Sequence, residues 1–317
     1  MKINSRKSFI CGIRGIKLSN KEYLFLKKNK PWGIILFERN IKNINQTKKL
    51  ISSIKNIFND QNYPILIDEE GGKVSRLKSI IDNSIFTGKY FGNLYKKNRK
   101  KFNLYYKVYL DQISYVLKLI GVNINTIPVL DLHRKSSHNI IGSRSYSGDN
   151  VTVKNVGDIC INLLHQNRIG TVIKHIPGHG LAKHDSHYYL PHVTKNLKYL
   201  KKNDFSVFKN KKSLFAMTAH IVFKSIDKKN CITLSKSGIK YIRNKIGFKN
   251  LIITDDISMK ALKYPFLENV KRAFDAGCNL VLHCNGNFSE MNKLASISPK
   301  LDKFIIKKTS EFYKLLS

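Results

Sequence analysis

Eight short apolar runs rich in β-branched residues recur along the 317-residue chain, and the gaps between them mostly have helical spacing. Near-continuous apolar strands indicate a parallel sheet buried on both faces by helices. The predicted strands cover 9–13, 32–37, 63–68, 122–132, 171–176, 214–221, 251–256 and 279–284. The predicted helices cover 20–28, 46–56, 103–120, 151–166, 200–208, 236–245, 267–276 and 288–295.

Eight alternating strand and helix units predict an α/β protein, a (β/α)8 TIM barrel that occupies residues 1–317 as a single domain. An open doubly wound sheet is the alternative, but it favours a G-x-G-x-x-G turn after the first strand, and "CGIRGIKLS" has the wrong glycine spacing. No proline-rich linker divides the chain. Two connections, 71–101 and 177–198, are longer than ordinary barrel loops, which is typical of functional segments.

The net charge of +36, from 57 Lys and Arg against 21 Asp and Glu, is a property that commonly accompanies nucleic-acid binding. The basic residues are mostly lysines spread along the chain among many Asn and Ile, so we interpret them as a solvated surface. We expect no specific nucleic-acid partner.

The sequence predicts a cytoplasmic protein with no membrane partner, because no apolar run approaches the roughly 20 residues of a membrane helix and no signal peptide is evident. The five cysteines are scattered without C-x-x-C spacing, as in a reducing compartment. We expect a monomer.

Polar residues follow the ends of most predicted strands, and in a parallel barrel those ends meet at one rim. Carboxylates, Arg, Lys and His together at one rim predict a site for a small polar substrate. The segments concerned are 68–77, Asp131, 142–146, 174–180, 219–220, 254–256 and 283–285.

The segment "IKHIPGHGLAKHDSHYYLPH" (173–192) holds five of the ten histidines. Close histidines with nearby aspartates suggest a metal site as one reading, although the spacing is not H-E-x-x-H. A catalytic loop is the other reading, with Gly178 and Gly180 letting the chain turn sharply away from the strand. We favour the loop and expect neither a metal nor a cofactor; His179, His184 and His192 are interpreted as loop or surface residues.

Several motifs resemble, in order and spacing, those of bacterial β-N-acetylglucosaminidases of glycoside hydrolase family 3, the single-domain type of peptidoglycan recycling. They are "IDEEGGKVSRL", "IPVLDL", "GSRSY", "KHIPGHG" with a following "DSH", "MTAH", "TDDISM" and "DAGCNLVLHCN". The resemblance covers nearly the whole chain. Glu69 stands where the family often has Gln.

The resemblance implies a retaining exo-β-N-acetylglucosaminidase. Asp255 would be the nucleophile, and His187 would be the acid/base, held by Asp185. The residues that would bind the sugar are Asp68, Arg76, Arg144, Lys174 and His175. Its substrate would be a sugar or muropeptide with terminal N-acetylglucosamine, such as N-acetylglucosaminyl-anhydro-muramyl peptide.

Two alternatives stay open at this point. A phosphorylase would use the same dyad with phosphate as the acceptor, and the basic charge is compatible with it. An inactive barrel that binds nucleic acid or wall fragments is the second alternative, and its independent support is the charge alone.

Overall fold

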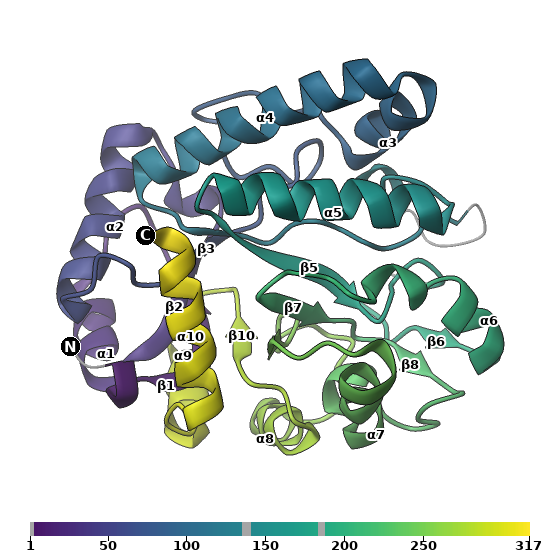
Figure 1. The fold of residues 1–317 in the computed structure, drawn as a ribbon. Coiled ribbons are helices and arrows are strands. Elements are labelled where there is room, and N and C mark those ends of the chain that lie inside the picture. Colours follow the sequence, from purple (N-terminus) through teal and green to yellow (C-terminus); the bar gives the residue numbers. More distant parts are fainter. Residues whose placement is uncertain (1–2, 135–140, 183–187) are drawn as a thin grey trace.

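The computed structural model describes residues 3–134, 141–182 and 188–317 (Figure 1). Eight parallel strands form one sheet in the order β10-β1-β2-β3-β4-β5-β7-β9. A bridge between Ile253 and Leu280 joins the two outer strands and closes the sheet into a barrel. The strands are β1 Lys7–Gly12, β2 Pro31–Leu36, β3 Ile65–Ile67, β4 Ile124–Asn125, β5 Gly170–Ile176, β7 Phe215–Thr218, β9 Leu251–Ile253 and β10 Val281–His283. The predicted (β/α)8 barrel is confirmed.

Helices surround the barrel in the predicted places (Figure 1). Their starts follow from local chemistry: Ser19 caps the first helix in a capping box with Glu22, and Asn43 and Asp149 cap two others. The helices are α1 Asn20–Asn29, α2 Ile44–Phe58, α4 Arg99–Ile120, α5 Asn150–Gln166, α6 Leu197–Lys202, α7 Lys236–Tyr241, α8 Phe266–Ala276 and α9 Phe288–Ile297.

Three elements lie outside the predicted pattern. Helix α3 (Gly88–Lys97) occupies the long connection after β3, and a two-stranded parallel sheet joins β6 (His192–Val193) to β8 (Val222–Phe223). Helix α10 (Lys303–Leu316) follows the eighth barrel helix, in a segment for which no helix was predicted.

Several predicted strands and helices are shorter in the structure. The strand expected over 122–132 is regular only at β4, because Pro128 has no N–H to give to a sheet. The helix expected over 200–208 ends at Lys202, and a separate turn of 3₁₀ helix covers Ser206–Phe208.

The strands separate two hydrophobic cores. Ile10 points into the barrel interior, whereas its neighbours Phe9 and Cys11 pack outward against the helices. Helix α10 contributes Phe312 to the interior core, with its ring centroid 5.4 Å from that of Phe215. The interior is therefore packed solid at one end, and the space for a ligand lies at the other.

Within the described residues, no helix is long and apolar enough to cross a membrane.

Candidate active site

A cavity opens at the carboxyl ends of the barrel strands, where the sequence predicted the site. All six predicted site residues that the structure describes line it. The full lining is Asp68, Glu70, Val74, Arg76, Ile141, Arg144, Lys174, His175, His179, Met217, Asp255, Leu282 and Cys284. The other two predicted residues, Asp185 and His187, and also His184, lie outside the described residues.

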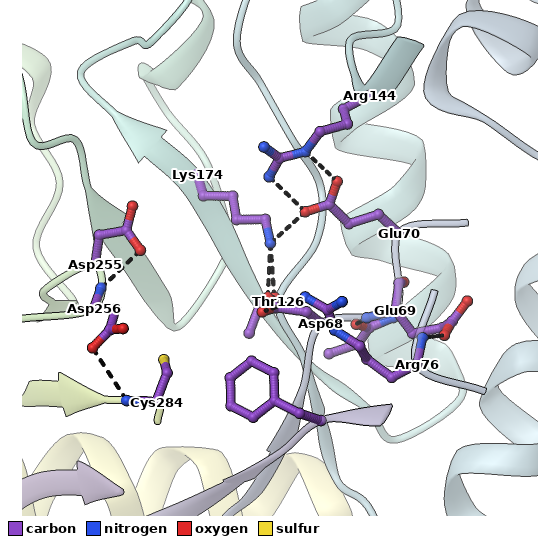
Figure 2. A network of polar contacts seen from close by, with 12 residues as sticks. Asp68, Glu69, Glu70, Arg76, Thr126, Arg144, Lys174, Asp255, Asp256 and Cys284 are labelled. Carbon is purple, nitrogen blue, oxygen red and sulfur yellow. Dashed lines mark hydrogen bonds and ion pairs between the residues drawn. The ribbon is translucent and has the colours of Figure 1, made fainter. Parts of the chain in front are cut away.

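Lys174 on β5 is the hub of the polar network in the cavity (Figure 2). Its Nζ lies 2.9 Å from Asp68 Oδ1, 2.6 Å from Glu70 Oε1 and 2.9 Å from Thr126 Oγ1. An ammonium group has three N–H donors, so these three acceptors satisfy it. A sugar hydroxyl can accept a hydrogen bond from Lys174 only by replacing one of them.

Glu70 joins Lys174 to Arg144. Its carboxylate accepts from Arg144 Nε at 2.7 Å and from a terminal guanidinium nitrogen at 2.8 Å, a planar two-point contact. Burial alone would raise the pKa of Glu70, but Arg144 and Lys174 lower it to about 2. Burial would likewise lower the pKa of Arg144, and Glu70 raises it above its ordinary value. Both groups are therefore charged at neutral pH.

Asp68 follows β3 and also stays ionised. Thr126 Oγ1 donates to its Oδ1, and Arg76 lies 3.7 Å from its Oδ2. Burial would raise the pKa of Asp68, but Lys174 and Arg76 bring it below its ordinary value. A carboxylate held in this form accepts hydrogen bonds from hydroxyl groups.

Glu69, between these two carboxylates in sequence, lies outside the cavity and holds the loop that carries Arg76. Its Oε2 accepts from Ser75 Oγ at 3.1 Å and from the backbone N–H groups of Arg76 and Leu77 at 2.7 and 3.1 Å. Its Oε1 accepts from Asn83 Nδ2 at 3.2 Å. Burial raises the pKa of Glu69.

Asp131 fixes the base of the histidine-rich segment. This fully buried carboxylate accepts from the backbone N–H groups of His175 and His179, and its Oδ2 lies 2.7 Å from His175 Nδ1. Burial would raise the pKa of Asp131, but His175 lowers it. A carboxylate on Nδ1 favours the Nδ1–H form of His175 and leaves Nε2 for a ligand.

His179 lies in the loop after β5, as expected, but it is not at the surface. Its side chain is buried in the cavity wall, with its ring centroid 5.4 Å from that of His175. Burial, with a contribution from His175, lowers the pKa of His179 to about 4. His192 is exposed on β6, as expected.

Asp255 follows β9 in a turn that is tied to β10. Asp256 Oδ1 accepts from Ser258 N and Cys284 N, each at 3.1 Å, and Asp255 Oδ1 accepts from Asp256 N at 2.8 Å. Figure 2 shows Asp255 across from Lys174 and the carboxylates around it. The geometry brings a carboxylate to face a wall of hydroxyl-binding groups.

Two members of the network, Glu70 and Thr126, were not singled out from the sequence, and Asp131 was placed at the rim without a role. Glu70 and Asp131 lie within the motifs "DEEGG" and "IPVLDL", each next to a strand end, and that position was the available signal. Within the described part of the chain, no group of three or more His, Cys, Asp or Glu side chains is arranged to hold a metal ion.

The arrangement suits recognition of a neutral polyhydroxyl molecule. Carboxylates accept from hydroxyl groups, guanidinium groups donate to oxygens, and the apolar side chains of Val74, Met217 and Leu282 exclude water from the same cavity.

Comparison with known proteins agrees with this chemistry. The model of the glycosyl hydrolase family 3 N terminal domain matches residues 8–308. The beta-hexosaminidase of Haemophilus influenzae is 29% identical over 291 residues, which are 88% of this chain and 79% of that protein. The beta-hexosaminidase of Neisseria meningitidis serogroup A is 30% identical over 290 residues, 88% of this chain and 78% of that protein.

The fold comparison leads to the same group of proteins. NagZ from Neisseria gonorrhoeae, solved in complex with N-trifluoroacetyl-D-glucosamine, has a TM-score of 0.83 at 26% identity, over 97% of this chain and 90% of that one. The match of the family model to almost the whole chain carries the assignment. This chain therefore belongs to glycoside hydrolase family 3 and is a β-hexosaminidase.

Proposed function

We propose that the chain is a retaining exo-β-N-acetylglucosaminidase that hydrolyses terminal, non-reducing, β-linked N-acetylglucosamine. The observation that carries the proposal is that Asp255 lies opposite Asp68, Arg76, Arg144 and Lys174 in one cavity, which His175 also lines. The N-acetylglucosamine analogue bound to the Neisseria gonorrhoeae protein supports this choice of sugar.

In the proposed reaction, Asp255 attacks the anomeric carbon while the bond to the leaving oxygen breaks. His187 gives that oxygen a proton, and the sugar remains covalently attached to Asp255. His187 then takes a proton from water, which displaces Asp255 and releases the sugar with its original configuration. Asp185 orients His187; both assignments rest on the "DSH" motif.

The proposed natural substrate is N-acetylglucosaminyl-anhydro-muramyl peptide from wall turnover, and we place the enzyme in the cytoplasm, where such fragments are recycled. The five cysteines, all within the described residues, are free thiols, which is consistent with a reducing compartment.

The activity is tested with an aryl β-N-acetylglucosaminide between pH 5 and 8. We expect release of the aryl alcohol and of free N-acetylglucosamine, also in phosphate buffer. The sugar phosphate as main product would identify a phosphorylase instead. No release of the aryl alcohol by folded protein would refute the glycosidase assignment.

The division of work between the catalytic groups is tested by substitution. Asp255→Asn should abolish both steps, because an amide neither attacks the anomeric carbon nor stabilises its positive charge. His187→Ala should slow cleavage of sugar leaving groups by roughly 100- to 10,000-fold and affect activated aryl groups much less. Asp185→Ala should change the rates in the same direction and more mildly. Equal losses of kcat/KM for both substrate types in His187→Ala would contradict the acid/base role.

A further inference from the structure

The charges in the cavity balance one another, although the protein as a whole carries +36. Among the described residues that line it, three are cationic and three are carboxylates. They are Arg76, Arg144 and Lys174, and Asp68, Glu70 and Asp255. A balanced cavity accepts a neutral sugar without leaving a buried charge unpaired.

Glu70 contributes most directly to this balance. It contacts two of the three cations at 2.6 to 2.8 Å, and its own side chain is only 4% exposed. Lys174 is 2% exposed and Arg144 14%, so solvent screens these contacts poorly. The donors of Lys174 Nζ and Arg144 that face the cavity wall are therefore occupied by a protein carboxylate.

We propose that Glu70 is a specificity-determining residue, which neutralises Lys174 and Arg144 and thereby makes the site select a neutral sugar and water over phosphate or another small oxyanion. Without Glu70, Lys174 still contacts Asp68, but Arg144 loses its planar contact and the cavity gains one uncompensated positive charge, which suits an oxyanion. This inference rests on the proposed function, since it explains why the enzyme would transfer the sugar to water.

The test is to remove the charge of Glu70 and measure phosphate binding directly. Glu70→Gln keeps the size of the side chain, and Glu70→Ala leaves space next to Lys174 and Arg144. The matched control is Glu69→Gln, which removes a buried carboxylate one residue away. Among the described residues, Glu69 contacts Ser75, Asn83 and backbone N–H groups and no cationic side chain. Thermal unfolding of all variants is followed as phosphate replaces chloride at constant ionic strength. The general effects of phosphate on the basic surface are then common to all variants, and the differences between variants report the cavity.

Phosphate should raise the Tm of Glu70→Gln or Glu70→Ala by several degrees more than the Tm of wild type or of Glu69→Gln. In the variants that retain activity, phosphate should inhibit roughly 10- to 100-fold more strongly than in wild type, as expected for one uncompensated cation in a poorly screened site. If Glu70→Gln is too unstable to assay, Glu70→Ala still reports through restoration of its Tm by phosphate.

Equal phosphate responses in the two Glu70 variants and in Glu69→Gln would overturn the proposal, and so would tight phosphate binding by the wild-type protein. The Tm measurement needs no substrate, so its outcome is independent of the assay for glycosidase activity. A failure of the proposed function would appear in that assay alone.

Discussion

At the scale of single residues, the side chains of this cavity are fixed by one another before a sugar enters. Lys174 has three acceptors, Glu70 has two cationic partners, and Asp131 holds both His175 and His179 of the histidine-rich segment. Such mutual support keeps the polar groups of the cavity in one orientation, which lowers the entropic cost of binding a ligand.

Glu69 allows a prediction about stability. In Glu69→Gln the amide oxygen can accept from Ser75, Arg76 and Leu77, and its NH2 group can donate to Asn83 Oδ1, which within the described residues has no hydrogen-bond partner. We expect Glu69→Gln to change the free energy of unfolding by less than about 1 kcal/mol, and Glu69→Ala to lower it by about 3 kcal/mol because buried donors lose their acceptor. Denaturant unfolding of both variants measures this.

The pH dependence of that comparison follows from the raised pKa of Glu69. The folded protein holds this proton more strongly than the unfolded chain, so the contribution of Glu69 to the stability of wild type falls as pH rises above about 4.5, until the folded pKa is passed. Glutamine has no such titration. The stability of Glu69→Gln relative to wild type should therefore improve between pH 4 and 7; a constant difference would contradict the assignment.

His179 gives a pH effect of the opposite sign. Its pKa is about 4 in the folded protein, against about 6.5 in an unfolded chain, so its neutral form is compatible with burial and its charged form is not. Its contribution is present above pH 6.5 and is lost as pH falls to 4, up to about 3 kcal/mol. Unfolding of His179→Gln should show a shallower loss of stability over this range than wild type. Identical slopes would mean that His179 is not held neutral.

At the scale of elements, the barrel was predictable because each strand and helix carries its own periodicity. Helix α10 was not predicted because a pattern of eight strand and helix units does not include a ninth helix. Its many lysines are typical of an exposed tail, and only the structure shows that Phe312 is buried in the barrel interior. The site residues that were predicted are those next to strand ends or within recognisable motifs. The pairing of Glu70 with Lys174 and the burial of His179 depend on side-chain packing between distant segments, which spacing alone does not specify.

Helix α10 is expected to stabilise the barrel by closing its interior. Phe312 is fully buried against Phe215 and beneath Gly170, and Trp32 Nε1 donates to Thr309 on the same helix at 2.8 Å. Phe312→Ala should lower the free energy of unfolding by about 3 to 5 kcal/mol. Phe304→Ala is the control, because Phe304 lies on the same helix and is 37% exposed; it should cost much less. Similar losses of unfolding free energy in the two variants would show that burial of Phe312 in the barrel interior is not what makes helix α10 stabilising.

At the scale of the whole molecule, a basic surface encloses a balanced cavity. The net charge arises from 57 basic residues that have only 21 acidic residues as partners, so most cations on the surface repel one another. In the cavity, by contrast, the carboxylates of Asp68, Glu70 and Asp255 balance the three cationic side chains. Charge thus has separate consequences for stability and for catalysis.

Added salt should therefore stabilise the protein and leave its chemistry nearly unchanged. Raising NaCl from about 20 to 300 mM shortens the screening length from roughly 20 to 6 Å, which weakens repulsion among surface lysines, so the Tm should rise by a few degrees. Hydrolysis of a neutral aryl glycoside should change by less than about twofold, because no charge is brought to the site.

Binding to duplex DNA, if measured in parallel, should be independent of sequence and should weaken steeply over the same range of salt concentration. Tight, sequence-selective DNA binding at 150 mM salt without glycosidase activity would instead support the inactive binding barrel, and a Tm that falls with salt would contradict the account of the surface charge.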